Sequence, residues 1–425
     1  MSIQSTCVKG TVSMGNPILV IGGGVAGLSA ARSLQLAGRR VAIIDPLPSP
    51  GGASFGNGGF ISPDSFMPGA QPGMLRKIPG WLRDPMGPLA IDPRYILHAL
   101  PWFFLWLRAG RLQRMTALAH SLYALHAPAL KEWKRLLGQE LYDRYIREGG
   151  EVILSDTPPS GSALELERRL IAQFGLEVDT LSPADIRKLY PQISDSVKFG
   201  ILKNGNAHTV SPAGLNSALA ETILADGGQF HRESVFKLIP ENGQWLILTS
   251  TGNHRASDVV VAAGVWSAQL LAPLGIKIPL ESQRGYHVMI KNSGLEIGLP
   301  FIHRNRGIGF TPMLDGLRVA GTVEFSGIDG LPNERRADQA MFHARQLFPA
   351  LTQSPQSIWT GQRPSTPDSL PVIGRMADKP GLWLCFGHGT HGMTAAPPSG
   401  RLIAELMMGE RTFIDPTPYS PSRFK

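Results

Sequence analysis

The chain has little cysteine and no long apolar run. Two cysteines, Cys7 and Cys385, occur in 425 residues, which excludes a disulfide framework and a metal site built from cysteine ligands. Cys385 stands in an apolar stretch and is expected to be an inert core thiol. No run of about 18 or more apolar residues is present, so the sequence predicts no membrane-spanning helix. Residues 1–15 hold one lysine and no apolar segment, so no signal peptide is expected there.

The charge balance is moderately basic. Lys and Arg number 41, Asp and Glu number 33, and the formal net charge is +8. Such an excess is compatible with an anionic substrate, with an anionic membrane surface, or with no specific partner. No basic block with interleaved aromatic residues occurs, so we expect no nucleic-acid partner. The sequence also shows no nucleophile triad, no paired acids and no metal-ligand cluster.

One stretch, Ile18–Asp45, has the pattern of a strand, a glycine turn, a helix and a second strand. Gly22 permits a tight turn, Gly24 lets the backbone approach a pyrophosphate, and Gly27 lets the helix pack on the strand. Asp45 follows Gly27 by 18 residues, where a carboxylate can accept a hydrogen bond from a ribose hydroxyl. The stretch predicts a dinucleotide site and leaves NAD and FAD open.

A passage rich in glycine, proline and serine follows, Pro46–Pro79. Its centre, Gly51–Pro63, is small, polar and dense in glycine. A stretch of this length without periodicity is usually functional or disordered. Because it comes directly after the second strand, we favour a loop that contacts the ligand over an ordinary surface loop.

The segment Trp81–Gln113 combines aromatic residues with arginines, and its prolines, Pro101 included, are expected to break it into short pieces. Two interpretations stay open. The first is a helix pair whose aromatic side chains fill the core. The second is a peripheral membrane contact, in which rings lie at the interface and cations meet anionic headgroups. One continuing helix is expected over Met115–Leu141.

Further along the chain the pattern predicts a second central strand of a nucleotide-binding sheet at Val259–Gly264. This strand comes more than 200 residues after the first, so the nucleotide domain is expected to be built from separated pieces. Alternating strands between Pro279 and Leu351 favour an antiparallel sheet. Near the end, a glycine-rich turn at 387–392 and a helix at Pro398–Met408 form a second place where helix N–H groups can face a ligand.

With these pieces the sequence resembles the D-amino acid oxidase superfamily of flavoproteins, and most of all the bacterial D-amino acid dehydrogenases. The likeness covers nearly the whole chain and is carried by Gly22–Gly27 with Asp45, Asn57–Pro63, Val261–Ser267, Arg363–Asp368 with Pro371–Gly374, and Gly387–Thr390. It implies non-covalent FAD rather than NAD. The fold class expected is α/β, a discontinuous Rossmann-like FAD-binding domain with an α+β substrate domain that contains an antiparallel sheet.

The resemblance also implies a division of the chain. The FAD-binding domain is expected at 16–80, 206–278 and 361–425, the substrate domain at 145–205 and 279–360, and a helical segment at 81–144. Residues implied in cofactor binding are Gly22, Gly24, Val25, Ala26, Gly27, Asp45, Ser54, Asn57, Gly58, Gly59, Ile61, Val235, Ala263, Gly264, Trp266, Gly389, Thr390, Gly392, Met393 and Thr394.

Arg363 stands in the Gly-x-Arg-Pro motif, whose arginine binds the substrate carboxylate in relatives. A planar guanidinium grips a carboxylate with two parallel hydrogen bonds, and the alternative is an arginine at the surface or core edge. His391 occupies the position that lies over the reactive face of the flavin in relatives, and three roles stay open for it: binding the carboxylate, shaping the side-chain pocket, or packing alone. Tyr286, His287 and Arg284 are weaker candidates on the strand that covers the substrate in relatives.

The reaction implied is oxidative deamination of a D-amino acid. The Cα hydrogen leaves as hydride to flavin N5, and water hydrolyses the imine to a 2-oxo acid and ammonia. Resemblance to the dehydrogenases implies a quinone or another electron acceptor. A cytoplasmic location is expected, with the inner face of the cytoplasmic membrane as an alternative.

Three alternative functions stay open. They are a dehydrogenase or oxidase for a cyclic or N-substituted amino acid such as hydroxy-D-proline, the flavin subunit of a hetero-oligomeric amine dehydrogenase, and an NAD-dependent dehydrogenase.

Overall fold

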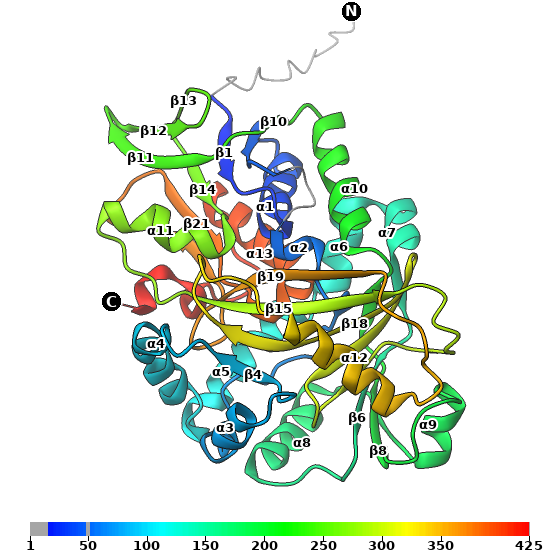
Figure 1. The fold of residues 1–425 in the computed structure, drawn as a ribbon. Helices are drawn as coiled ribbons and strands as arrows, with labels where there is room; N and C mark the ends of the chain where they lie inside the picture. Colours follow the sequence, from blue (N-terminus) through cyan, green and yellow to red (C-terminus); the bar gives the residue numbers. More distant parts are fainter. Residues whose placement is uncertain (1–15, 48–51, 425) are drawn as a thin grey trace, which may run out of the picture.

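The computed structural model describes residues 16–47 and 52–424 (Figure 1). Residues 1–15 with Cys7, and Gly51 in the glycine-rich passage, lie outside the described residues. Cys385 is buried, and burial raises the pKa of its thiol to about 12. This state is the inert core thiol that the sequence predicts.

A six-stranded sheet forms one half of the molecule. Its order is β10 (Gln229–His231), β2 (Val41–Ile44), β1 (Ile18–Ile21), β14 (Val259–Val261), β21 (Leu382–Phe386) and β20 (Val372–Arg375). All neighbours are parallel except β20, which runs antiparallel to β21. Strands from three distant parts of the chain therefore lie side by side, which confirms the discontinuous α/β fold.

Two helices from opposite ends of the chain pack closely on this sheet, α1 (Val25–Leu36) and α13 (Gly392–Met408). Their contact depends on Gly400, where a Cβ would lie 2.3 Å from the carbonyl oxygen of Ser29. Gly27 permits a similar approach of α1 to the preceding turn, because a Cβ there would lie 1.9 Å from the Gly22 carbonyl oxygen. Helices α10 (Pro212–Ala225) and α6 (Ala129–Leu137) pack beside them.

The predicted start of the last helix at Pro398 is wrong, since α13 begins at Gly392 and contains Pro397 and Pro398. A proline inside a helix leaves the carbonyl four residues earlier without its N–H donor. Here the indole of Trp133 donates to the carbonyl of Met393 at 2.8 Å. A side chain from α6 thus replaces the hydrogen bond that Pro397 removes.

The single helix predicted over Met115–Leu141 is also wrong. The structure has α5 (Leu112–His126), α6 and α7 (Gln139–Tyr145) in its place. Pro128 precedes α6, and Gly138 takes a φ of +78° between α6 and α7. A positive φ favours glycine and interrupts a right-handed helix.

A nine-stranded sheet forms the second half. Its order is β19 (Ser357–Ser365), β15 (Glu281–Ile290), β18 (Gly316–Phe325), β17 (Ile308–Met313), β16 (Phe301–His303), β6 (Glu151–Ser155), β8 (Phe199–Lys203) and β7 (Val178–Leu181), with β4 (Leu89–Ile91) paired to β18. Most neighbours are antiparallel, as predicted, while β16 with β6 and β18 with β4 are parallel. Helix α12 (Arg335–Leu347) packs against β15 and β18.

Two small sheets and several helices complete the described chain. The strands are β11 (Val235–Glu241), β12 (Gln244–Thr249) and β13 (Asn253–Ala256) in one sheet, and β3 (Phe60–Ile61), β9 (Ala207–Thr209) and β5 (Ile146–Glu148) in the other; the helices are α2 (Gly52–Phe55), α3 (Met74–Arg83), α4 (Ile96–Ala109), α8 (Ser162–Phe174), α9 (Pro183–Leu189) and α11 (Ser267–Leu271). Two serines cap helices: Ser182 accepts from the Asp185 N–H at the start of α9, and Ser211 accepts from the Gly214 N–H at the start of α10. The six domain boundaries stay a prediction.

The aromatic segment divides between core and surface. Trp102 on α4 is buried and donates to the Ser365 carbonyl at 3.1 Å, which agrees with core packing. On the same helix Leu97, Leu100 and Phe104 are 74%, 51% and 67% exposed. Pro101 lies inside α4 and does not break it, contrary to expectation. Among the described residues no helix is both long and apolar enough to cross a bilayer.

Replacing Gly400 with Ala is expected to push α13 away from α1, because the added Cβ meets backbone that cannot rotate aside. Overpacking of this kind costs about 1–3 kcal/mol, measurable as a lower midpoint in chemical unfolding. Gly80→Ala is the matched control, since a Cβ at this helical position meets nothing within 4 Å. An unchanged midpoint for Gly400→Ala would show that the helices do not need this close approach.

Candidate functional site

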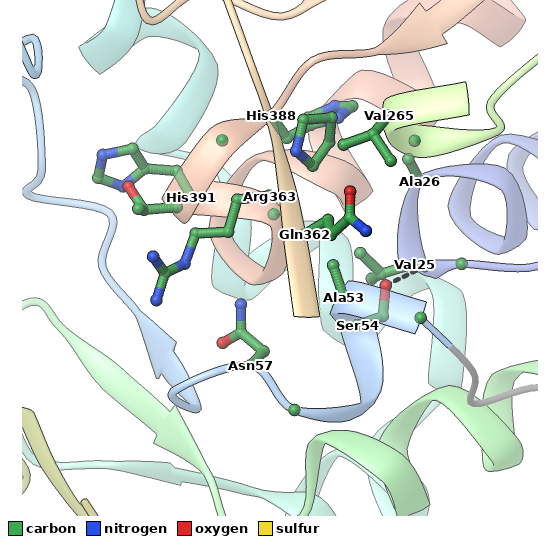
Figure 2. A pocket seen from close by; sticks show the side chains of 18 of the residues that line it. Val25, Ala26, Ala53, Ser54, Asn57, Val265, Gln362, Arg363, His388 and His391 are labelled. Carbon is green, nitrogen blue, oxygen red and sulfur yellow. Dashed lines mark hydrogen bonds between the residues drawn. The ribbon is translucent and has the colours of Figure 1, made fainter. Parts of the chain in front are cut away.

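A cavity of about 1010 Å³ is lined by residues of both large sheets. Its wall includes Gly22 and Asp45 of the first strand–helix–strand unit. It also includes Arg363 of β19, which Figure 2 shows with Asn57 and His391. Ligand pockets typically measure about 300–1,000 Å³, so this space is large enough for an extended ligand. The predicted dinucleotide site and the predicted carboxylate site therefore belong to one continuous cavity.

The glycine turn forms part of the cavity wall. Gly22 has a φ of +114°, and a Cβ there would lie 2.3 Å from the Ala262 carbonyl oxygen. Only glycine at position 22 therefore allows the backbone that follows β1 to pass this close to the backbone that follows β14 without strain. At the start of α1, the Val25 N–H donates to the hydroxyl of Ser54 at 2.9 Å, a hydrogen bond drawn in Figure 2. Helix N–H groups at this position suit an anionic pyrophosphate.

Asp45 follows β2 at the edge of the cavity. Its carboxylate accepts from the Gly23 N–H at 2.6 Å and from the Leu47 N–H at 2.8 Å. Burial raises the pKa of this carboxyl, and the two backbone hydrogen bonds oppose that rise. The side chain is thereby fixed beside the glycine turn, where the predicted ribose contact requires it.

The glycine-rich loop after α2 is fixed against the nine-stranded sheet. The carbonyl of Asn57 accepts from the Arg318 guanidinium at 2.6 Å, and the carbonyl of Gly58 accepts from the Thr311 hydroxyl at 2.7 Å. Gly56 leaves room for the Trp359 ring, since a Cβ there would lie 2.1 Å from it. The loop is therefore a rigid part of the cavity wall, as a ligand-contacting loop requires.

Arg363 places a positive charge in the wall of the cavity. Its Nη1 donates to the Thr322 carbonyl at 3.3 Å, and no carboxylate in the described chain lies within 4.0 Å of it. Burial lowers the pKa of the guanidinium to about 10, so it stays charged near neutral pH. Because a buried charge requires a partner, this group favours an anionic ligand.

Two residues make room for that guanidinium. A Cβ at Gly285 would lie 2.1 Å from Nη2 of Arg363, so glycine is required beside it on β15. Thr322 on β18 has a φ of +57°, which is strained for a β-branched residue. Its hydroxyl accepts from the side chain of Arg336, which holds the conformation that directs the Thr322 carbonyl at Arg363. The sequence analysis missed both residues.

His391 ends the short 3₁₀ helix Gly389–His391 and lines the cavity. Its ring centroid lies 5.0 Å from that of His126. Burial lowers the pKa of His391 to about 4 and that of His126 to about 3, so both rings are neutral near pH 7. His388 is hydrogen-bonded to the Ser399 hydroxyl at 3.0 Å, which agrees with a structural role in the turn.

The three weaker candidates on β15 have different environments. Tyr286 lines the cavity, but its hydroxyl donates to Glu324 and accepts from the Asn333 N–H. The structure does not bring Arg284 or His287 to the cavity. Arg284 is buried and donates to the carbonyls of Gly330 and Leu331, and His287 is hydrogen-bonded to the Gly56 carbonyl at 3.0 Å. These two side chains support the wall from behind.

Most of the other predicted residues reach the cavity. Those that line it are Gly22, Gly24, Val25, Ala26, Asp45, Ser54, Asn57, Gly58, Val235, Ala263, Gly264, Trp266, Gly389, Thr390, Gly392 and Thr394. Those that do not are Gly27, Gly59, Ile61 and Met393, which hold the backbone behind the lining. Gly59 shows the difference: its φ of +88° shapes the loop, and its N–H donates to the Asn57 side chain at 2.8 Å.

The cavity also holds charged residues that no motif announced, among them Glu151, Glu167 and Lys203. Glu151 looked like an ordinary strand residue, and Lys203 follows it by 52 positions. The two residues come together because β6 and β8 pair with Glu151 opposite Lys203. Only that pairing could have revealed them.

Glu233, which lines the cavity, lies together with His231 and His254. One ligand atom of each of the three residues lies within 4.8 Å of the others. Glu233 already accepts from the Thr249 hydroxyl at 2.5 Å and is hydrogen-bonded to His254 at 2.9 Å. These hydrogen bonds lower the pKa of Glu233 to about 2, with the Thr249 bond the largest cause. The Glu233 carboxylate thus has hydrogen-bond donors within the protein. These hydrogen bonds fix the turn that leads into β11.

The comparisons with known proteins agree with this site. The family model described as "FAD dependent oxidoreductase" matches residues 17–406. A D-amino-acid oxidase of Bradyrhizobium diazoefficiens is 35% identical over 422 residues, which cover 96% of this chain and 99% of that protein. A D-amino acid dehydrogenase of Dechloromonas aromatica is 31% identical, covering 93% of this chain and 97% of that protein.

Solved structures show the same fold. A glycine oxidase from Geobacillus kaustophilus superposes with a TM-score of 0.74 at 21% identity and covers 97% of this chain and 99% of its own. An L-proline dehydrogenase from P. horikoshii gives a TM-score of 0.74 at 20% identity and covers 97% and 98%. At these identities the likeness concerns the fold alone.

The chain therefore belongs to the DAO family of FAD-dependent oxidoreductases. It is an FAD-dependent amino acid oxidoreductase. The residues present fit FAD: the Gly22–Gly27 turn suits the pyrophosphate, Asp45 suits the ribose, and the cavity continues from there to Arg363. The choice of FAD over NAD, which the glycine turn alone left open, is confirmed.

Replacing Arg363 with Ala is expected to raise the KM for an amino acid substrate at least tenfold, because the hydrogen bonds lost are charge-assisted and are each worth about 1.5–3 kcal/mol. Gly285→Ala should reproduce part of this loss by displacing the guanidinium. The measurements are steady-state kinetics and the flavin absorbance of the purified variants. Arg375→Ala, an exposed arginine nearby in sequence, is the control. Normal KM with normal flavin content in Arg363→Ala would refute the carboxylate assignment.

Proposed function

We propose that this protein oxidises D-amino acids to 2-oxo acids and ammonia and passes the electrons to a quinone or another respiratory carrier. The observation that carries the proposal is the half-buried Arg363 guanidinium, whose pKa is lowered by desolvation and which faces the cavity without a carboxylate partner in the described chain. An amino acid supplies that carboxylate, and its Cα is then placed at a fixed distance from the arginine.

The chain's own residues bind and orient the substrate. Arg363 holds the carboxylate, Gly285 and Thr322 hold Arg363, and His391 stands in the same wall as a neutral ring. When bound, FAD supplies at N5 the acceptor for the hydride that leaves Cα. Water then hydrolyses the resulting imine, releasing ammonia and a 2-oxo acid. No protein group is needed as a base toward the carbon.

The first turn of α13 supports the ring end of the cofactor site. Gly392 and Thr394 line the cavity, and the N-terminus of a long helix carries a partial positive charge. The Thr394 hydroxyl accepts from the Ser62 N–H at 2.9 Å, which ties the helix to the glycine-rich loop. Positive potential here stabilises the negative charge that the ring gains on reduction.

The names of relatives support the stereochemistry, and the dehydrogenases among them support the acceptor. Relatives more than 30% identical include a D-amino-acid oxidase and a D-amino acid dehydrogenase. The Asn57–Pro63 motif resembles the dehydrogenases, and this resemblance favours a quinone over oxygen.

Mixing the holoenzyme with D-alanine without oxygen is expected to bleach the flavin absorbance rapidly, while L-alanine leaves it unchanged. The reduced enzyme should then reoxidise faster with a soluble quinone than with dissolved oxygen. Stopped-flow spectroscopy measures the rates of flavin reduction and of flavin reoxidation. Bleaching by the L enantiomer alone would refute the D assignment, and equal rates with oxygen and quinone would refute the dehydrogenase assignment.

We also propose that α4 contacts an anionic membrane surface, where the quinone resides. Leu97, Leu100 and Phe104 form an exposed apolar stripe, and their spacing places them on one face of the helix. Exposed Arg94, Arg108, Arg111 and Arg114 lie along the same segment. Apolar side chains with cations beside them are the combination that interfacial helices use. The buried Trp102 is not part of this surface.

Replacing Leu97, Leu100 and Phe104 with Ser is expected to lower binding to vesicles that contain anionic lipid at least tenfold, because the triple variant removes the exposed apolar area. Co-sedimentation with vesicles measures the binding. A matched control replaces Leu36, Leu224 and Leu314, which are also exposed but lie on other elements. Equal vesicle binding by wild type and the α4 variant would refute the membrane contact.

A further inference from the structure

Polar side chains, all of them buried except the exposed Arg304, form part of the cavity wall on the side of His391. We call this group the polar lobe; it consists of Ser62, Glu151, Glu167, Lys203, Asn206 and Arg304, all of which line the cavity. Lys203 is near enough to His391 for its charge to contribute to the lowered pKa of that histidine. The oxidation at Cα uses none of these side chains, so their cost of burial needs another explanation.

The positive charges of the polar lobe are already paired. Glu167 lies 3.7 Å from the Lys203 ammonium and 3.2 Å from the Arg304 guanidinium. Lys203 also donates to the Asp64 carbonyl at 3.4 Å and stands 5.6 Å from the centre of the Phe66 ring. These contacts leave the two cations little to offer an incoming anion.

Glu151 is the exception. Its side chain is buried, with the residue 3% exposed, and it reaches the cavity. Oε2 accepts from the Ser62 hydroxyl at 2.5 Å and from the Asn206 amide at 3.1 Å, whereas no cation in the described chain lies within 4.0 Å. Burial raises the pKa of this carboxyl, and the Ser62 hydrogen bond, the more distant Lys203 charge and the Asn206 hydrogen bond oppose that rise.

The charges around Glu151 leave a negative excess. The acids are Glu151, Glu167 and the adjoining Asp64, and the bases are Lys203 and Arg304. Burial raises the pKa of Glu151 and of Asp64, and when all five groups are ionised three negative charges face two positive ones. A ligand cation at Glu151 would balance the group and supply the missing partner. The other end of the cavity, at Arg363, has the opposite requirement and takes a carboxylate.

Resting on the proposed function, we infer that the polar lobe is a subsite for a cationic substrate side chain, whose ammonium is bound by Glu151. The carboxylate of the substrate lies at Arg363 and its basic end at Glu151. The preferred substrates are then basic amino acids such as D-lysine. Glu151 is a specificity residue in this arrangement and takes no part in the oxidation.

The test compares D-lysine with D-norleucine, which has the same carbon chain without the ammonium. Wild-type holoenzyme is expected to show a kcat/KM at least tenfold higher for D-lysine, as a charge-assisted hydrogen bond predicts. Glu151→Gln keeps the shape and the Ser62 contact, and it should abolish this preference while leaving kcat/KM for D-norleucine within about threefold. Glu281→Gln is the matched control: this carboxyl is also buried and unpaired by a cation, but it lies outside the cavity lining.

Several other results would overturn the inference. A wild-type preference for D-norleucine or D-glutamate would mean that the lobe is not a cation site. An equal loss on both substrates in Glu151→Gln would assign Glu151 to structure or to the α-amine. If the variant does not fold, the wild-type ratio alone decides. If neither substrate reduces the flavin, the proposed function fails, and spectral titration of the flavin with both compounds still tests the subsite: equal affinities refute it.

Discussion

One largely desolvated guanidinium in the cavity wall constrains the strands around it. Arg363 lies where two sheets meet, and burial lowers its pKa without removing its charge. A glycine on the neighbouring strand and a strained threonine carbonyl make space for it and orient it. A charge held this way costs free energy in the empty protein. A substrate carboxylate recovers that cost, so the site is selective for carboxylates by its construction.

The cavity joins two different kinds of recognition. At one end, backbone N–H groups and a helix N-terminus suit a diphosphate, and this part depends on main-chain geometry. At the other end, side chains from the nine-stranded sheet select the substrate. The first end depends on where the glycines stand, and the second end depends on which side chains are present. Proteins with the same glycine positions can therefore bind FAD and still act on amino acids of different kinds. The names of the relatives, which include a glycine oxidase and a D-amino acid dehydrogenase, follow that division.

Sequence reasoning predicted the parts that local pattern controls. The glycine turn, Asp45 and the strand at Val259 follow from short-range signals, and Arg363 follows from a motif. Sequence reasoning failed where a residue distant in the chain changes what the local pattern predicts. Pro397 stays inside α13 because Trp133 supplies the hydrogen bond that the proline removes, and no signal near Pro397 reveals this. Glu151 was missed for the same reason, since its neighbours arrive through the pairing of β6 with β8.

The order of strands in the six-stranded sheet has a consequence for synthesis. Strand β14 lies between β1, near the start of the chain, and β21, near its end. Until the last strands leave the ribosome, β14 has an open edge and α1 lacks its partner α13. An open strand edge invites pairing with other chains, and long-range contacts form slowly. The cofactor site therefore lacks β21 and α13 until the last part of the chain has been synthesised, and the edge of β14 stays open to pairing with other chains until then.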